Sequence, residues 1–364
     1  MYDGPARVRR LNPATGRRIL VVSDIHGNLP YLRGLLEKAA FGADDELIIA
    51  GDFLEKGPES LNTLRFVMEL ERQGNCHALL GNCDGWSDIF SLTPEEDEAA
   101  VAYMLNKKRG LVWDMCGELG IDPAELEDFA ACKELLLRAY RPEWEYLAHL
   151  PHAYETERFV FVHAGMDPSK PLRAHRAGEL TRCDAFLRSG RRFDRWVIVG
   201  HWPVMLYGEN VVCANPIIDR EKHIVSIDGG CVLKDDGQLN ALVIPDARSD
   251  DFGFVAYDPF PLRTVKDAQA ASERSYYIRW GDSRVQVLER GGEFSRCRHV
   301  RTGYEMDILT KYLFSAGEFT DCNDCTDYVL PLQPGDAVGV VEETSRGWFV
   351  KHKGVSGWYF GELL

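Results

Sequence analysis

The sequence has no long hydrophobic run and little positive charge. No apolar stretch approaches the ~20 residues that a helix needs to cross a bilayer, so we expect no membrane-spanning segment. The 364 residues carry 57 acidic and 42 basic side chains, a net charge of −15. Because phosphate backbones are bound by Lys and Arg, this balance argues against a nucleic-acid duplex or a membrane surface as partner. The segment 1–18 is rich in arginine, but the apolar run that follows it is too short for a signal peptide. We therefore expect a cytoplasmic protein.

The sequence also lacks the paired cysteine spacing of a zinc site or a disulfide framework. Its ten cysteines are scattered, except for Cys322 and Cys325. Disulfide frameworks belong to short secreted chains, and a single C-x-x-C has no second pair with which to complete a zinc site. We interpret these two residues as reduced thiols in a loop, with a redox or metal role as the alternative. The sequence contains no internal repeat and no low-complexity segment.

What the sequence does contain is a set of short hydrophobic runs that each end in a polar residue. Residues 19–22 lead to Asp24 and His26, residues 47–50 to Asp52, residues 78–80 to Asn82, residues 159–162 to His163, and residues 197–199 to His201. Such runs are typical of strands buried on both faces, and the side chains at their carboxyl ends line one crevice. Two carboxylates, an amide and three imidazoles suit a pair of divalent transition metals. The sequence therefore predicts a dinuclear metal site.

Strands and helices alternate from residue 19 to about residue 80, with helical spacing at 29–40 and 60–71. This alternation predicts a largely parallel sheet with right-handed crossovers. Capping patterns with Pro at the first helical position, at 93–96 and 122–125, begin a helical insertion of about residues 86–150. We expect this insertion to be either an ordinary packing layer or a lid that shapes the substrate site. Strand patterns return between residues 159 and 244, and the catalytic domain is expected to cover residues 1–245.

These segments resemble the motifs of the calcineurin-like metallophosphoesterases, and more closely those of the bacterial phosphoprotein-phosphatase group. The matching segments are Asp24-Ile25-His26, Gly51-Asp52-Phe53-Leu54-Glu55-Lys56-Gly57, Gly81-Asn82-Cys83-Asp84, His163-Ala164-Gly165 and Gly200-His201. The resemblance spans about residues 17–245 and implies an α/β fold, a four-layer αββα sandwich.

The resemblance also implies which side chains hold the metals. Asp24 and His26 would bind the first metal, and Asp52 would bridge to a second metal that is completed by Asn82, His163 and His201. The two divalent ions would be Mn, Fe or Zn, since imidazole-rich sites favour these over Mg. They would activate a hydroxide that attacks phosphorus in line.

Two positions depart from the family pattern. Cys83 stands where the family has its acid, a histidine that is oriented by the following carboxylate, here Asp84. Lys56 replaces a phosphate-binding arginine and loses the bidentate fork, while Arg182 aligns with the second such arginine. A thiol donates a proton poorly beside two cations, so we expect esters with good leaving groups, such as aryl phosphates, to be preferred. Alternatively, Cys83 is only a small buried thiol and another group donates the proton.

The C-terminal third is expected to be all-β. Residues 246–309 have the pattern of short antiparallel strands, and residues 310–364 resemble an SH3-like barrel. Exposed Trp348 and Tyr359 would suit a proline-rich peptide, although the Pro and Tyr of peptide-binding versions are absent near the end. Packing of the barrel on the catalytic domain, or self-association, is the other expectation.

Together these features predict a metal-dependent phosphoesterase that acts on a phosphorylated protein or a small phosphate ester. The first substrate expected is a phosphoprotein, phosphorylated on Ser, Thr or Tyr. The enzyme alternatives are hydrolysis of a dinucleoside polyphosphate and hydrolysis of a phosphodiester. A further alternative is a weakly active phosphatase fold that serves as a scaffold, against which the intact set of six metal ligands argues.

Overall fold

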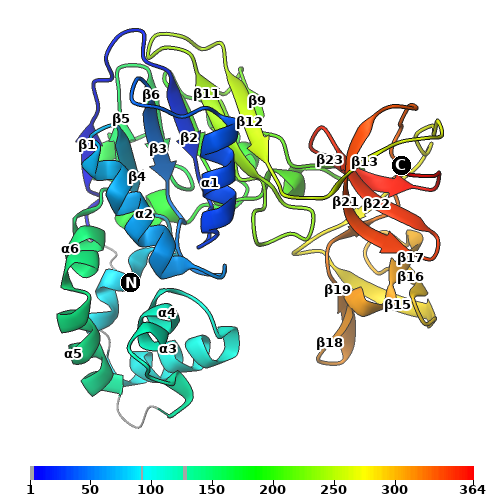
Figure 1. Ribbon diagram of the computed structural model, residues 1–364, viewed down its shortest axis with the longest axis horizontal. Helices are drawn as coiled ribbons and strands as arrows, with labels where there is room; N and C mark the ends of the chain where they lie inside the picture. Colours follow the sequence, from blue (N-terminus) through cyan, green and yellow to red (C-terminus); the bar gives the residue numbers. More distant parts are fainter. Residues whose placement is uncertain (1–3, 92, 126–128) are drawn as a thin grey trace. The chain divides into compact units, whose positions relative to one another are not determined.

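The protein, seen here as a computed structural model, is described for residues 4–91, 93–125 and 129–364 (Figure 1). These residues form two compact units. The first comprises the chain up to Pro203 together with Pro216–Leu233 and Gly237–Tyr257; the second comprises Val204–Asn215, Lys234–Asp236 and Asp258–Leu364. Among the described helices, none has the length and apolar character needed to span a membrane.

Two mixed sheets form the centre of the first unit as far as it is described. One has the order β12-β11-β2-β3-β4, with β2 (Ile19–Val22), β3 (Glu46–Ala50), β4 (Cys76–Leu79), β11 (Leu239–Ile244) and β12 (Gly253–Tyr257). The other has the order β1-β5-β6-β7-β10-β9, with β1 (Val8–Arg10), β5 (Ala153–Glu155), β6 (Phe159–Val162), β7 (Trp196–Val199), β9 (Ile217–Asp219) and β10 (Ile224–Ser226). The strands β2, β3 and β4 are parallel, as the alternation of strands and helices predicts.

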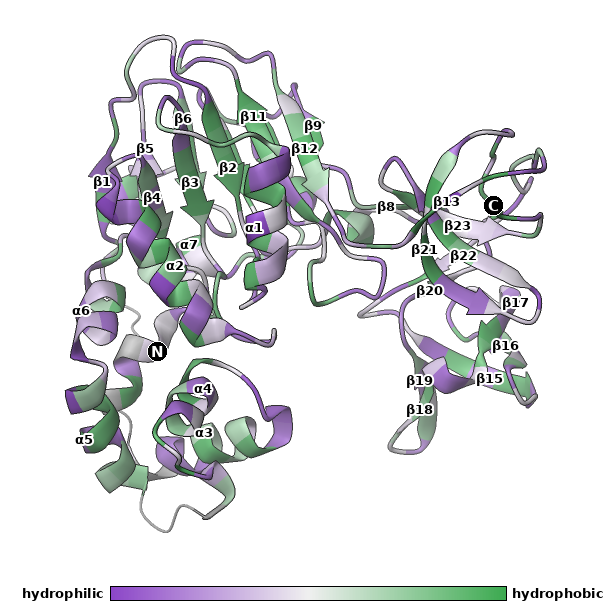
Figure 2. Cartoon of the chain, in the orientation of Figure 1, coloured by the Kyte–Doolittle hydropathy of each residue, from purple (hydrophilic) through white to green (hydrophobic). Residues whose placement is uncertain are grey.

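The two sheets pack face to face, and helices cover the outer face of the first. The covering helices are α1 (Leu29–Lys38) and α2 (Ser60–Arg72). Leu20 of β2 belongs to the cluster that contains Leu35 and Leu64 of these helices, whereas Val21 belongs to the cluster that contains Phe161 and Ile198 of the second sheet. Every residue of β2 and β3 is buried, which explains why these strands are continuous hydrophobic runs (Figure 2).

The chain between β6 and β7 forms one short helix, α7 (Ala177–Thr181), and two 3-10 segments, Leu172–Ala174 and Phe186–Ser189. The predicted metallophosphatase-type α/β fold, followed by an all-β C-terminal region, is confirmed.

The expected helical insertion contains η1 (Gly85–Ser91), α3 (Pro94–Lys107), α4 (Leu111–Glu118), η2 (Pro123–Glu125), α5 (Phe129–Ala139) and α6 (Arg141–His149). The predicted capping box is present at α3, where Thr93 and Glu96 each accept from the other's backbone N–H. The second predicted cap, at 122–125, begins only a 3-10 turn, and residues 126–128 lie outside the described residues. The insertion is tied to the loop after β3, because the Tyr103 hydroxyl and the Leu111 N–H both donate to the Glu55 carboxylate.

The described part of the second unit is all-β. One sheet has the order β13-β21-β22-β23-β8, with β8 (Val212–Cys213), β13 (Leu262–Thr264), β21 (Ala337–Thr344), β22 (Gly347–His352) and β23 (Val355–Tyr359). Another has the order β17-β16-β15-β19-β18, with β15 (Arg284–Glu289), β16 (Phe294–His299), β17 (Glu305–Leu309), β18 (Leu313–Ala316) and β19 (Phe319–Cys322), and β14 (Tyr277–Ile278) pairs with β20 (Cys325–Thr326).

Three details differ from the sequence-based expectations. Tyr359 is fully buried in the core of the sheet with Val338 and Val350, and its hydroxyl donates to the Asp267 carbonyl at 3.0 Å. The prediction that Tyr359 is exposed for a peptide is therefore wrong, and the SH3-like resemblance stays a prediction. The first unit also continues beyond residue 245, because β12 pairs with β11. In the second unit, β18 and β19 belong to the sheet of β15 rather than to the sheet of β21.

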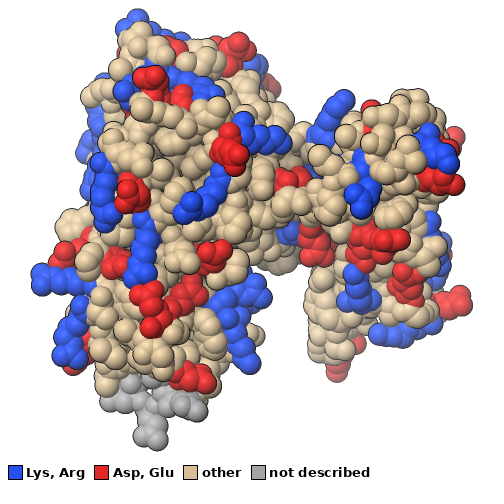
Figure 3. All heavy atoms as spheres, in the orientation of Figure 1, with Lys and Arg blue, Asp and Glu red and all other residues tan. Residues whose placement is uncertain are grey.

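Charged side chains of both signs are mixed over the face shown in Figure 3. Because a phosphate backbone requires a continuous basic surface, this face offers little attraction to a nucleic acid.

Candidate metal centre

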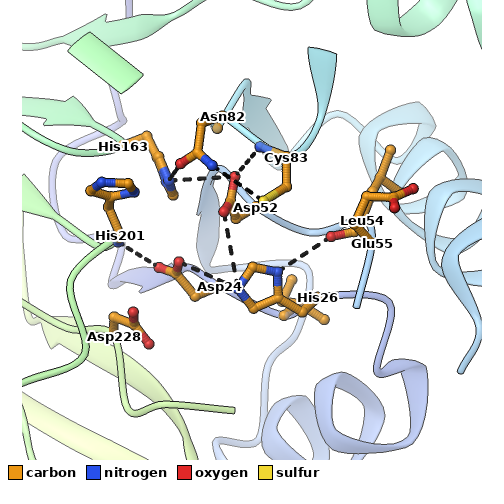
Figure 4. A network of polar contacts seen from close by, with 12 residues as sticks. Asp24, His26, Asp52, Leu54, Glu55, Asn82, Cys83, His163, His201 and Asp228 are labelled. Carbon is orange, nitrogen blue, oxygen red and sulfur yellow. Dashed lines mark hydrogen bonds and ion pairs between the residues drawn. The ribbon is translucent and has the colours of Figure 1, made fainter. Parts of the chain in front are cut away.

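The six predicted metal ligands lie together where the central strands end (Figure 4). They follow β2 (Asp24, His26), β3 (Asp52), β4 (Asn82), β6 (His163) and β7 (His201). The strands β2 to β4 are parallel to one another, and so are β6 and β7, so their carboxyl ends deliver these side chains to one place.

One group of side chains surrounds His26. Its Nε2 atom lies 3.8 Å from Asp24 Oδ1 and 4.0 Å from Asp52 Oδ2. The Nδ1–H donates to the carbonyl of Leu54 at 3.4 Å, which leaves Nε2 as the nitrogen that faces the carboxylates. This Nε2 atom is buried and has no hydrogen-bond partner among the described residues. A buried nitrogen that faces two carboxylates and has no hydrogen-bond partner is suited to bind a cation, so the residues fit a metal.

A second group surrounds His163. Its Nδ1–H donates to the carbonyl of Ala50 at 3.0 Å, and its Nε2 lies 3.1 Å from Asn82 Oδ1 and 3.4 Å from Asp52 Oδ1. Asp52 therefore faces both histidines, one with each oxygen, as a bridging carboxylate must. His201 stacks edge-on against His163, with ring centroids 5.1 Å apart, and its backbone N–H donates to Asp24 Oδ2 at 2.9 Å.

The backbone at the site is strained. Asp24, His26, Asp52 and His201 have φ values of 55°, 51°, 50° and 67°. This left-handed region costs a residue with a Cβ atom of order 1–3 kcal/mol, and it persists only where the surroundings impose it. Four such residues among six candidate ligands indicate that the loops are shaped for ligand geometry rather than for stability.

The charges of the cluster perturb one another strongly. Burial raises the pKa of Asp24 to about 6, and burial lowers the pKa of His26 to about 3. Burial opposes the charge on His163 as well, but the Asp52 carboxylate outweighs it and raises the pKa of His163 to about 10. The pKa of Asp52 lies well below its ordinary value, because His163 and His26 outweigh the effect of burial. Two divalent cations would balance the negative charge of the carboxylates, as the proton on His163 does here.

Asp84 holds the bridging residue in place. Its carboxylate accepts from the backbone N–H groups of Asp52 at 2.7 Å, Gly81 at 2.8 Å and Leu54 at 3.0 Å. Burial, followed by the Asp52 charge, raises the pKa of Asp84 to about 8. Asp84 is thus a positioning residue for the loops after β3 and β4, because its two oxygens connect both.

Cys83, Lys56 and Arg182 lie beside the ligands and line a pocket of about 400 Å³. The Cys83 N–H donates to Asp52 Oδ1 at 2.7 Å, and its thiol belongs to a group with His26 and Asp52 whose ligand atoms all lie within 4.8 Å of one another. Burial raises the pKa of the Cys83 thiol well above its ordinary value. Burial lowers the pKa of Lys56, but the charges of Cys83 and Asp52 outweigh it, and the net pKa is raised.

The predictions from sequence did not include two further acids. Asp228, which follows β10, is fully buried with Oδ2 unpartnered, and burial together with Asp24 raises its pKa well above the ordinary value. Asp184 Oδ1 lies 3.2 Å from His201 Nε2. Asp228 could have been found, because it ends a hydrophobic run like the other ligands do; Asp184 follows no such pattern.

A two-sheet α/β fold that gathers carboxylates, an amide and imidazoles at its strand ends defines the protein as a candidate two-metal hydrolase. The family model described as calcineurin-like phosphoesterase matches residues 17–229, more than half of the chain. The chain therefore belongs to this family, whose metallophosphoesterases use divalent metals.

Individual relatives match parts of the chain. It is 31% identical over 176 residues to the symmetrical bis(5'-nucleosyl)-tetraphosphatase of Ectopseudomonas mendocina (strain ymp), covering 46% of this chain and 54% of that protein. It is 45% identical over 149 residues to the protein of the same name from Psychromonas ingrahamii, covering 41% and 44%. The chain thus spans about half the length of the curated relatives it matches. A solved protein serine/threonine phosphatase from Saccharomyces cerevisiae has 12% identity and a TM-score of 0.42, covering 71% of this chain and 85% of that one.

Proposed function

We propose that the protein hydrolyses a phosphoanhydride bond of a nucleotide, of the dinucleoside polyphosphate class, at a centre of two divalent metals. Asp24, His26 and Asp52 would hold one ion. Asp52 would share the other with Asn82, His163 and His201. The support is the convergence of these side chains, with the unpartnered His26 Nε2 as the observation that favours a bound cation.

The bound ions would supply Lewis-acid polarisation of the phosphoryl oxygens and a hydroxide nucleophile near neutral pH. The chain's own residues do the rest. Lys56 and Arg182 stand at the pocket wall beside the ligands and offset the negative charge of the phosphates. Asp84 keeps Asp52 fixed through its three backbone hydrogen bonds, so the bridging carboxylate does not have to reorganise during turnover.

The pocket beside the metal centre is the basis for the proposed substrate class. Its volume of about 400 Å³ falls in the range of small-molecule sites, and it is larger than a phosphorylated serine side chain requires. Trp86 and Tyr103, whose rings lie 6.3 Å apart at 44°, line it together with Ile89. An aromatic wall stacks on any nucleobase, typically with ~1–3 kcal/mol per base. A nucleoside next to a polyphosphate matches this combination of aromatic and basic walls, and the names of the curated relatives agree with it.

A phosphotyrosine protein is the second candidate, and Cys83 favours it over a phosphoserine protein. Without an imidazole acid at this position, the leaving group must depart with little protonation. Phenolate and nucleoside phosphate leave far more easily than the alkoxide of serine. The aromatic pocket accepts a phenyl ring as well as a nucleobase, so the phosphoprotein hypothesis from the sequence narrows to its tyrosine form.

The test is turnover by the metal-stripped protein after addition of Mn, Co or Zn. The panel contains diadenosine tetraphosphate, ATP, phosphotyrosine and phosphoserine peptides, para-nitrophenyl phosphate and its bis ester. We expect diadenosine tetraphosphate to have the highest kcat/KM and to yield only ADP. Preference for the phosphotyrosine peptide would replace the nucleotide proposal by the second candidate. No turnover of any member, with two metals bound, would favour a scaffold function.

The matched control is Asp52→Asn, which keeps the shape of the bridging residue but removes its charge. This variant should lose both metal binding and turnover. Retention of turnover would overturn the two-metal assignment itself.

A further inference from the structure

We propose that Cys83 is itself a metal ligand, so that the first metal site is built from an imidazole, carboxylates and a thiolate. The proposal deepens the function proposed above, since it requires the same metal centre. It assigns to Cys83 a role different from the proton donor that the resemblance suggests for this position.

The geometry around Cys83 carries the proposal. The sulfur of Cys83, a ring nitrogen of His26 and a carboxylate oxygen of Asp52 all lie within 4.8 Å of one another. Metal–sulfur and metal–nitrogen bonds of ~2.3 and ~2.0–2.1 Å allow two ligands on opposite sides of an ion to be ~4.4 Å apart. A single cation therefore reaches all three atoms with small adjustments of the side chains.

Two further contacts fix Cys83 in this place. Its backbone N–H donates to Asp52 Oδ1 at 2.7 Å, so the backbone of Cys83 cannot move away from the bridging carboxylate without breaking a partly buried hydrogen bond. His26 belongs to the same group of three, and its Nε2 has no hydrogen-bond partner among the described residues. The unpartnered nitrogen is an independent sign that the space between these atoms belongs to a ligand.

The surroundings also offer hydrogen-bonding groups to the sulfur. Asn82 Nδ2 donates to Cys83 Sγ at 3.3 Å, and Lys56 forms a side-chain hydrogen bond with Cys83. In the binding step the S–H bond breaks, the proton passes to solvent and a sulfur–metal bond forms. Asn82 and Lys56 would then stabilise the thiolate by hydrogen bonding to its sulfur.

A thiolate ligand changes which metal the site prefers. Sulfur is a soft ligand that selects Zn, Fe or Co, whereas Mn and Mg prefer oxygen. We therefore expect the first site to bind Zn or Co more tightly than Mn. This difference in affinity should decrease when the sulfur is removed. The proposal also gives Lys56 a role, because Lys56 lines the pocket together with Cys83 and interacts with the ligand sulfur.

The experiment uses the full chain, loaded anaerobically with Co(II), and records its absorption spectrum and cobalt content. A thiolate ligand gives an intense sulfur-to-cobalt charge-transfer band in the near ultraviolet, which oxygen and nitrogen ligands do not give. The variants are Cys83→Ser, which keeps the size and replaces sulfur by a hard oxygen, and Cys183→Ser as the control. Cys183 is a partly exposed thiol outside the two groups of candidate ligands.

We expect the band in the wild type and in Cys183→Ser, and no band in Cys83→Ser. The ratio of Zn to Mn affinity, measured by competition, should fall by at least about 10-fold in Cys83→Ser. Two bound cobalt ions without the band, or a band that persists in Cys83→Ser, would overturn the assignment of Cys83 alone. If the wild type binds no cobalt, the proposed metal centre fails with it.

Should Cys83→Ser fail to fold, the wild-type protein still decides the question through ¹¹³Cd NMR. A cadmium resonance in the range of sulfur-ligated sites supports the proposal, and resonances only in the oxygen and nitrogen range refute it.

Discussion

Replacing Glu55 by glutamine should remove a pH dependence of stability that this buried carboxylate creates. Glu55 joins the loop after β3 to the helical insertion, since it accepts from the Leu111 N–H at 2.7 Å and from the Tyr103 hydroxyl at 3.2 Å. Its exposed fraction is 3%. Burial raises the pKa of Glu55 from 4.5 to about 7, although the Leu111, Tyr103 and Trp86 hydrogen bonds oppose this and Asp114 adds to it.

The sign and the size of the effect follow from proton binding. Between pH 4.5 and about 7 the folded protein retains the Glu55 proton while the unfolded chain has released it. The contribution of Glu55 to the free energy of unfolding is therefore fully present below pH 4.5, falls as the pH rises and levels off above pH 7. At 1.36 kcal/mol per pH unit, the fall amounts to about 3 kcal/mol. Glutamine does not titrate and still offers an acceptor to Leu111.

The assay is urea unfolding of the metal-free wild type and of Glu55→Gln at pH 5 and pH 8. The other titrating groups of the site contribute to both proteins, so they cancel in the comparison. From pH 5 to pH 8, the free energy of unfolding of Glu55→Gln should rise relative to that of the wild type, by most of about 3 kcal/mol. The control is Glu69→Gln on α2, where the carboxylate is exposed, and its difference from the wild type should not change with pH. A difference that is also constant for Glu55→Gln would refute the reasoning.

Four further predictions concern the site, its pocket and the helix α4. Asp52→Asn should weaken the binding of both metals by more than about 100-fold, measured as metal content after dialysis, because the bridging charge faces both histidines. Gly81→Ala should unfold at lower temperature or lose metal binding, because its Cβ would come within 2.1 Å of Asp52 Oδ1. By contrast, Gly117→Ala in α4 should raise the stability by about 0.5–1 kcal/mol, since among the described residues no atom outside the adjoining helix backbone lies within 4 Å of the added Cβ. Trp86→Leu should raise KM for diadenosine tetraphosphate by about 10-fold, because ~1–3 kcal/mol of stacking is lost. The KM for para-nitrophenyl phosphate should change less. Equal changes in KM for the two substrates would contradict the proposal that Trp86 binds a base.

The positions of the candidate ligands could be predicted because the signal is local. Each ligand stands within a few residues of the end of a hydrophobic run, and a buried parallel strand turns sharply at that point. Asp52 after β3 and His163 after β6 illustrate this, since both strands begin and end close to where the sequence places them. The helices α1 and α2 were predictable for the same reason, because their apolar spacing lies within one segment.

The features that sequence reasoning did not find depend on distant pairing. Val212–Cys213 forms an edge strand on β23, about 140 residues further along the chain, and no local pattern marks so short a strand. Tyr359 lies on the inner face of its strand because its buried partners in the core come from four other segments, those of Val265, Leu330, Val338 and Val350. The Glu55 carboxylate accepts from Tyr103 and Leu111, which lie 48 and 56 positions away, and no local pattern marks such distant partners.

Metal binding and folding must be coupled in this protein, and the reason lies in the arrangement of charge. Four buried carboxylates, those of Asp24, Asp52, Asp84 and Asp228, gather at strand ends with exposed fractions of at most 2%. Several ligand residues also have left-handed backbone, which costs of order 1–3 kcal/mol each. Only the folded chain brings these groups together, so a cation that binds it stabilises the fold by about 2.7 kcal/mol at 100 times its dissociation constant. The cluster that destabilises the metal-free chain is therefore the same feature that makes cation binding favourable.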